Sequence, residues 1–423
     1  MSDAAIAQPV KASTSSGSSR RVWVFAIVAL LIVLPHVPGL DADFGRSLLT
    51  QMGIAAVFAL SFNVLFGQTG LLSFGHAVYF GMGGYVAAHV MRAINHGLPL
   101  PMVLVPLAGA AGGLACGAVL GALTTRRAGT IFALISLGVG ELFYAAAFML
   151  PGFFGGEEGI TASRTRAAID LGIPLATQLD VYYLVVLWAL VAAALMYAFQ
   201  RTPVGRMCNA VRDNPQRAQF VGYSTTRVRF VAFAVAATFA GLAGGLHAIN
   251  YEIVAADALS AQRSGAVLIM AYIGGSACFI GPVLGAIVIT WLSSSLSAYT
   301  PAWQLYLGVF FIVMILYAPQ GLAGLVLRHR AIARAPAFGR VLGAYGVAAV
   351  PLAVALAGAV LVIEMSYRVS TQAELGTRMR VLSMNVDAAS PWPWALATLA
   401  LAGGAVAFRR ALPIVGRAWS AAS

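Results

Sequence analysis

The sequence predicts an all-α polytopic membrane protein, a bundle of transmembrane helices, on three observations. Of the 423 residues, 60% are hydrophobic and only 9% are charged, whereas a soluble protein carries about 25% charged residues. Apolar runs long enough to cross a bilayer, roughly 20 residues, recur along almost the whole chain. Basic residues gather in the short segments between these runs, which is typical of cytoplasmic loops.

Twelve apolar segments are expected to be membrane-spanning helices, because inside lipid each backbone N–H and C=O must find a partner within its own segment. A membrane barrel would instead show alternating ten-residue pieces. Ten segments form a predicted core over residues 22–328, and two more lie in a C-terminal extension over residues 329–423. The segments are 22–40, 48–66, 71–91, 100–124, 129–151, 181–200, 228–249, 264–280, 282–299, 303–319, 340–363 and 392–408.

The basic clusters predict the orientation of the chain. Residues 1–21 are rich in Ala, Ser and Gly and are expected to form a disordered cytoplasmic tail. With twelve crossings, all the clusters fall on one side of the membrane, so both termini are expected to be cytoplasmic. The net charge of +12 thus reflects the basic cytoplasmic loops. The sequence has no basic face with interleaved aromatic residues, so we do not expect it to bind nucleic acid. The clusters lie near Arg20, Arg126, Arg206–Arg229, Arg328–Arg340 and Arg409–Arg417.

Sequence motifs for catalysis, metals or nucleotides are absent. There is no G-x-x-x-x-G-K-[ST], H-E-x-x-H or G-x-S-x-G. The three cysteines have no zinc or redox spacing. We therefore expect neither an enzyme nor a cofactor in this chain. The energy for any transport would come from an ion gradient or from a partner protein.

The stretch from Gly67 to Tyr85 contains six glycines in nineteen residues, together with the polar side chains of Ser73 and His76. Glycine permits helix breaks, and broken helices at membrane depth occur where they face protein or a cavity. Gly70, Ser73 and His76 are therefore candidates for a translocation pathway. Tight helix packing explains the glycines equally well, and an interior hydrogen bond is the simpler interpretation of His76.

Two other features are candidates for the same pathway. Glu141 is the one acidic residue well inside a long apolar run, where a charge costs about 3 kcal/mol. It should face the bundle interior with a partner or be protonated, either for transport or as an interhelical hydrogen bond. Gly274 and Gly275, which precede Gly281-Pro282, should break or bend the helices there.

A basic, amphipathic segment of about thirty residues, 200–229, lies on the predicted cytoplasmic side. Pro203 suits the first position of a helix reaching Val211, and Pro215 that of a second helix ending at Gly222. Short helices parallel to the membrane would suit a rigid coupling element, although a solvated loop is the simpler interpretation. The candidate coupling residues are Arg206, Arg212, Asp213, Asn214, Pro215, Arg217 and Gly222.

An ordered set of motifs resembles the LivM-type permeases of branched-chain amino acid ABC importers over roughly residues 25–328. The motifs are Gly70-Leu-Leu-Ser-Phe-Gly-His-Ala77, Gly155-Gly-Glu-Glu-Gly-Ile160, Thr202-Pro-Val-Gly-Arg206, Asp213-Asn-Pro-Gln-Arg217, Phe239-Ala-Gly-Leu-Ala-Gly-Gly245, Gly281-Pro-Val-Leu-Gly285 and Pro319-Gln-Gly-Leu-Ala-Gly324. The extension after residue 328 falls outside this resemblance, and the sequence assigns it no function.

The resemblance implies an inner-membrane importer for Leu, Ile or Val with several subunits. A second, LivH-type permease would complete the pathway, and a periplasmic binding protein would deliver the substrate. Two cytoplasmic ATPase subunits would bind ATP and Mg, and residues 213–222 would dock on one of them. Two alternatives stay open: an ion-coupled secondary transporter with Glu141 as proton relay, and a related permease for urea or amides.

Overall fold

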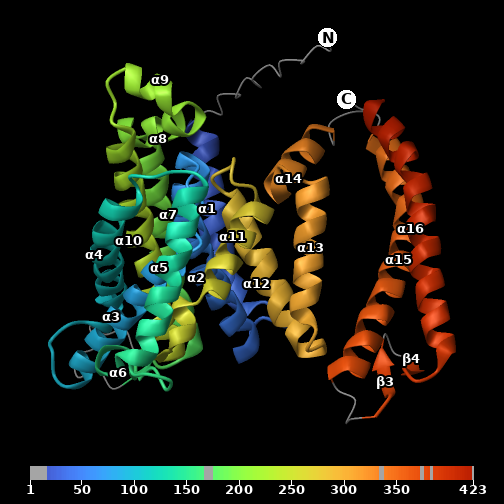
Figure 1. Cartoon of the computed structure of the whole chain (residues 1–423), viewed down its shortest axis with the longest axis horizontal. Coiled ribbons are helices and arrows are strands. Elements are labelled where there is room, and N and C mark those ends of the chain that lie inside the picture. Colours follow the sequence, from blue (N-terminus) through green and yellow to red (C-terminus); the bar gives the residue numbers. More distant parts are fainter. Residues whose placement is uncertain (1–16, 166–174, 333–337, 372–375, 382–383, 422–423) are drawn as a thin grey trace. The chain divides into compact units, whose positions relative to one another are not determined.

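The computed structural model describes residues 17–165, 175–332, 338–371, 376–381 and 384–421, and it confirms the all-α bundle (Figure 1). A helix occupies each of the twelve predicted apolar segments. They are α1 Gly17–Val33, α2 Asp43–Thr69, α3 Ala77–Asn95, α4 Val105–Thr124, α5 Thr130–Met149, α7 Gln178–Arg201, α10 Thr225–Tyr251, α11 Ala261–Gly274, α12 Gly281–Tyr299, α13 Trp303–Tyr317, α15 Phe338–Thr371 and α16 Pro391–Ser420.

Shorter elements connect these helices. The helical ones are η1 Leu34–His36, η2 Met102–Leu104, α6 Pro151–Phe154, α8 Pro203–Asp213, α9 Pro215–Phe220, η3 Ala256–Leu259 and α14 Gly321–Ile332. There are two antiparallel strand pairs. In the first, β1 Ile160–Thr161 pairs with β2 Ile253–Val254, and in the second, β3 Arg378–Val381 pairs with β4 Met384–Asp387. Of the predicted N-terminal tail, residues 1–16 lie outside the described residues, and residues 17–21 already belong to α1.

Fewer helices than twelve are long and apolar enough to cross a membrane by themselves. Eight qualify among the described residues, or nine when α13 and α14, bent by 52°, count as one broken span. The others are the short α1, the 14-residue α11 and the glycine-rich α3. An irregular segment precedes α3 (residues 70–76) and another precedes α11 (residues 252–260). We therefore expect non-helical chain to cover part of the membrane depth beside these two helices.

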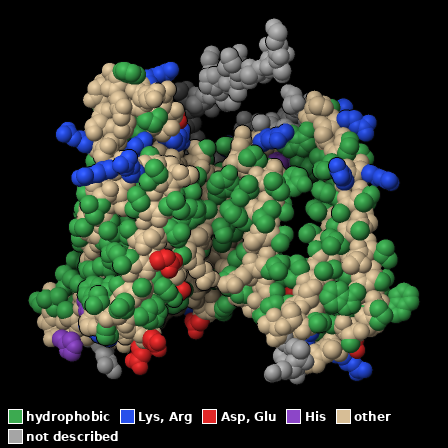
Figure 2. Space-filling view, in the orientation of Figure 1, with side chains coloured by type: hydrophobic (Ala, Val, Ile, Leu, Met, Phe, Trp, Pro, Cys, Tyr) green, Lys and Arg blue, Asp and Glu red, His purple; other side chains and the backbone are tan. Residues whose placement is uncertain are grey.

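The chain divides into two compact units, Met1–Ser264 and Gly265–Ser423. The boundary predicted at residue 328 stays a prediction. In the first unit α10 packs against α2, α3 and α4, and α7 packs against α2. Figure 1 places α8 and α9 at one end of this unit and α6 at the other, and Figure 2 shows Lys and Arg gathered toward the α8–α9 end.

Glycines bring α4 and α10 together at backbone distance. Gly109 and Gly113 of α4 face Gly241 and Gly245 of α10, and a Cβ added to Gly241 would lie 2.3 Å from the carbonyl oxygen of Gly109. Small residues spaced by four let helices associate in lipid, where apolar burial gives no driving force. Close packing through small residues therefore holds α4 and α10 together.

In the second unit, α15 and α16 form an antiparallel hairpin with a close approach at Gly358 and Gly404. Glu364 lies one residue beyond the predicted span 340–363 but still within the 34-residue α15, and its Oε1 accepts a hydrogen bond of 2.8 Å from the Tyr306 hydroxyl. The strand pair β3–β4 lies between α15 and α16 in the sequence.

Replacing Gly241 by Val should destabilise the protein, because the added side chain must displace the backbone of α4. Overpacking of this kind typically costs about 1–3 kcal/mol, which a lower melting temperature in detergent would report. Gly308→Ala on α13 is the control, since its added methyl group would meet nothing within 4 Å. Equal melting temperatures for both variants would contradict the seam.

Candidate functional site

The glycine-rich stretch is a true helix break. α2 ends at Thr69, Gly70 adopts a left-handed conformation with φ +70°, and α3 starts only at Ala77. Neighbouring side chains satisfy the freed backbone: Phe74 N donates to Ser136 Oγ at 2.9 Å, and Ala77 N donates to Ser264 Oγ at 3.0 Å. The predicted break is confirmed, and it lies within packed protein rather than against lipid.

His76 is fully buried beside this break. Its Nε2 lies 3.0 Å from Ser61 Oγ, and its ring stacks on Phe58 at 5.5 Å and meets the edge of Phe62 at 5.3 Å. This environment agrees with an interior histidine that is held by a hydrogen bond and aromatic packing. Nothing in it tests a contact between His76 and a substrate.

Several buried polar atoms near the break have no hydrogen-bond partner among the described residues. They are Asn63 Oδ1, both amide atoms of Gln68, Ser73 Oγ and His76 Nδ1. Buried polar groups normally have partners, and unpaired ones require an explanation. Ser73 and His76 thus belong to a polar patch inside the bundle that water or a passing solute could satisfy, although their role in a pathway stays a prediction.

Arg212 connects the segment 200–229 to the same break. From α8, its Nη1 donates a hydrogen bond to the carbonyl oxygen of Gly67, one of the last carbonyls of α2. A Cβ on Gly70 would lie 3.1 Å from Arg212 Cγ. Arg212 also forms a surface ion pair with Asp213 at 3.0 Å, a kind that contributes little stability. Arg212 therefore links α8 directly to the end of α2.

The two short helices of this segment are confirmed, with the predicted prolines at their starts. Thr202 Oγ1 caps the start of α8. Asn214 Oδ1 caps the start of α9, where it accepts a hydrogen bond of 2.9 Å from Arg217 N. After α9, Gly222 turns the chain with φ +92°. The side chains of Arg206, Asp213, Pro215 and Arg217 are exposed.

An apolar cluster anchors α8 to the bundle, formed by Cys208, Val211, Ala218, Val228 and Ala232. Burial raises the pKa of the Cys208 thiol to about 12, so this cysteine is an unreactive packing residue. Beyond this anchor, Phe220 is 91% exposed and Val221 70%. These two apolar side chains protrude beside the exposed Arg217.

Glu141 lies on an exposed face of α5 and forms no hydrogen bond or ion pair with the residues that the structure describes. The helix packs through its other side, where Ser136 and Gly140 meet the break at Phe74 and Gly75. Within this chain, then, Glu141 does not face the interior as expected. A carboxylate at this depth needs water or another protein beside it.

Gly274 and Gly275 closely approach the backbone of neighbouring segments. A Cβ on Gly274 would lie 2.0 Å from the carbonyl oxygen of Gly281, and one on Gly275 would lie 2.5 Å from that of Gln320. The predicted break between α11 and α12 is confirmed. Close packing accounts for both glycines, and their place in a pathway stays a prediction.

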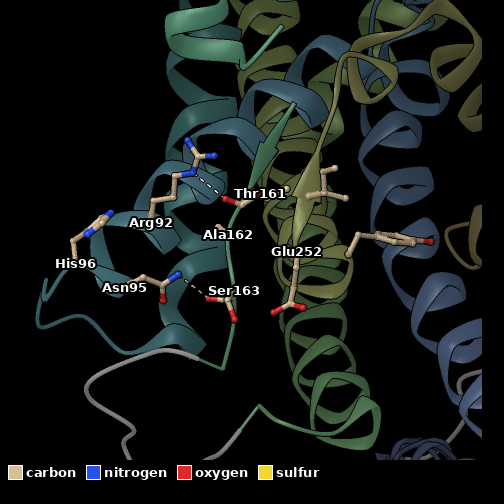
Figure 3. Close-up of a pocket in the computed structure, with 9 residues that line it drawn as sticks. Arg92, Asn95, His96, Thr161, Ala162, Ser163 and Glu252 are labelled. Carbon is tan, nitrogen blue, oxygen red and sulfur yellow. Dashed lines mark hydrogen bonds between the residues drawn. The ribbon is translucent and has the colours of Figure 1, made fainter. Parts of the chain in front are cut away.

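A polar pocket of about 670 Å³ lies at the end of the first unit opposite α8 and α9. Figure 3 shows Arg92, Asn95 and His96, from the end of α3, facing the chain around Thr161–Ser163 and Glu252. Arg92 Nε donates to Thr161 O at 2.9 Å, and Asn95 Nδ2 to Ser163 O at 3.0 Å. Sequence reasoning missed this pocket because its walls come from distant segments.

An ion pair at 3.0 Å between Arg263 Nη2 and Asp257 Oδ2 was also missed. Its residues fall between two predicted spans and resemble ordinary loop charges in the sequence. Among the described residues, no group of three or more His, Cys, Asp or Glu side chains could hold a metal ion.

Comparison with known proteins gives consistent matches. Residues 46–318 match the family model described as branched-chain amino acid transport system, permease component. The LivM permease protein of the high-affinity branched-chain amino acid transport system of Salmonella typhimurium is 25% identical over 328 residues, 72% of this chain and 76% of that protein. Escherichia coli LivM is 26% identical over the same shares. Salmonella typhimurium LivH is 22% identical over 64% of this chain and 91% of that protein. No solved structure matches the chain.

A double-mutant cycle should show that His76 and Ser61 stabilise each other. His76→Phe keeps the ring volume but removes Nε2, and Ser61→Ala removes its partner oxygen. Each change should lower the free energy of unfolding by about 1 kcal/mol, and the double variant should lose little more than either single one. Additive losses would mean that the hydrogen bond contributes nothing.

Proposed function

This chain belongs to the branched-chain amino acid transport permease family, and we propose that it is a membrane subunit of an ATP-driven importer for leucine, isoleucine and valine. The observation that carries the proposal is the family match over residues 46–318, the region that holds both the helix break and the α8–α9 segment. Relatives named as LivM permeases support the choice of substrate.

A second permease of the LivH type is the partner that we propose within the membrane. The chain is similar to both LivM and LivH proteins, so the two permeases would share one fold and could pair around a common pathway. The exposed face of α5 that carries Glu141 supports this arrangement, because a neighbouring permease or the water-filled pathway would keep the carboxylate away from lipid.

Two ATPase subunits would bind ATP and Mg, one of them docking on α8 and α9 of this chain. Exposed Phe220 and Val221 offer an apolar anchor, and Arg206 and Arg217 offer charge beside it. The hydrogen bond from Arg212 to Gly67 would then carry a movement of the docked ATPase to the helix break. In this proposal α8, α9 and both termini lie in the cytoplasm of a cell with an inner membrane.

Replacing Glu141 by Ala should lower uptake of labelled leucine by about tenfold or more if the carboxylate lies in the pathway. Because Glu141 forms no hydrogen bond or ion pair with the described residues, the amount of assembled complex should not change. Leu142→Ala is the matched control, since Leu142 is 64% exposed on the same helix. Loss of the assembled complex along with uptake would indicate a packing role instead.

Changes in α9 should separate ATP hydrolysis from transport. A Gly/Ser linker in place of Asp213–Gly222 should release the ATPase or leave hydrolysis running without uptake. Phe220→Ala should weaken ATPase binding by about 2 kcal/mol, as removal of an interface anchor does. Trp392→Ala is the control, since it alters an aromatic side chain that is 75% exposed on α16. It should change neither ATPase binding nor uptake. Normal uptake in the linker variant would refute the coupling role.

A further inference from the structure

The chain between α10 and α11 is irregular. α10 ends at Tyr251, and Glu252 takes a left-handed conformation with φ +56°, the one described residue other than glycine with a positive φ. A two-residue strand and the single turn η3 follow, and α11 starts at Ala261. At the start of α11, Ser260 Oγ accepts a hydrogen bond of 3.2 Å from Arg263 N.

The Arg263 end of this irregular segment lies near the middle of α2. The Arg263 guanidinium carbon sits 5.1 Å from the centre of the Phe80 ring, which packs 4.7 Å from that of Phe58. At 1.5 Å per residue, Phe58 lies about 22 Å from the start of α2 at Asp43 and about 16 Å from its end at Thr69. Non-helical backbone at such depth is tolerated where protein encloses it or where it lines an aqueous cavity.

The ion pair of this segment is only partly enclosed. The Asp257 side chain is 67% exposed and that of Arg263 29%. Lipid would not accept an open carboxylate at this depth, so its free side faces water or another protein. Glu252 and Ile253, at the start of the same segment, line the polar pocket beside Arg92. The segment thus leads from that pocket to the ion pair.

These groups match the chemistry of a free amino acid. A guanidinium binds a carboxylate through two parallel hydrogen bonds, and the start of α11 adds the partial positive charge of a helix N-terminus. The Asp257 carboxylate accepts hydrogen bonds from an ammonium group. The His247 ring lies 5.3 Å from the Phe80 ring and 4.4 Å from the Tyr251 ring, and these rings offer an aromatic surface for a side chain.

We propose that Arg263 and Asp257 form an intramembrane site that binds the α-carboxylate and the α-ammonium group of the transported amino acid. When the zwitterionic amino acid binds, the ion pair between Arg263 and Asp257 is replaced by two ion pairs, one from each side chain to the substrate. The site rests on the proposed function, which it deepens by naming residues that recognise the substrate after its release into the membrane subunit.

The test measures weak binding of L-leucine to the purified permease–ATPase complex, without any binding protein, by saturation-transfer NMR. Two analogues compete: leucinamide, which lacks the carboxylate, and 4-methylpentanoate, which lacks the ammonium group. Unlabelled leucine should compete better than either analogue by more than about tenfold, since each analogue loses a charged hydrogen-bonding partner. Analogues that compete as well as leucine in the unaltered complex would overturn the proposal.

Variants then assign each charge. Asp257→Asn should lose the preference for leucine over 4-methylpentanoate, and Arg263→Gln the preference over leucinamide. Asp257→Glu and Arg263→Lys, which keep the charges, should retain both preferences. Asp387→Asn, which removes the pair that Arg378 forms between β3 and β4 at 3.9 Å, is the control and should behave as the unaltered chain.

The swapped variant Asp257→Arg with Arg263→Asp separates recognition from structure. A purely structural ion pair would be restored by the swap, with normal leucine binding, and that result would also overturn the proposal. ATP-driven uptake of labelled leucine by the unaltered complex tests the proposed function separately. A complex that takes up leucine while both neutral variants keep their preferences refutes only the site.

Discussion

Satisfaction of backbone hydrogen bonds inside lipid is the constraint on which the rest of this structure depends. Helices meet it by themselves, whereas the breaks after α2 and after α10 need neighbouring groups. Serine side chains supply them: Ser136 accepts from Phe74 N, and Ser264 accepts from Ala77 N. The second of these bonds ties the start of α3 to the start of α11. This contact links the break after α2 to the helix that follows the irregular segment after α10.

In the proposed function, transport and energy input would involve one continuous set of contacts. Arg212 joins α8 to the last turn of α2, beside the left-handed Gly70. The break that follows leads to His76 and then, through Ala77 and Ser264, to the segment that carries Asp257 and Arg263. The glycine seam between α4 and α10 lies outside this set of contacts and is formed by close backbone approach.

The sequence predicted what depends on local composition. Apolar runs located the helices, and Pro203, Pro215 and Gly222 located the starts and end of the two short helices. Features that depend on packing were beyond it. Glu141 was expected to face the interior, yet α5 turns its Ser136 side inward. In the sequence, Asp257 and Arg263 resemble ordinary loop charges. Their place beside Phe80 depends on contacts between segments that are far apart in the chain, which the sequence alone does not show.

ATP-dependent uptake by the purified assembly tests the central claim most directly. The tagged chain would be isolated in mild detergent with its co-eluting subunits, reconstituted into vesicles with a leucine-binding protein, and supplied with labelled leucine. The account predicts a second permease and two ATPase chains in the eluate, and uptake that requires ATP and survives the collapse of ion gradients. Uptake by this chain alone, driven by an ion gradient and abolished by an ionophore, would contradict it.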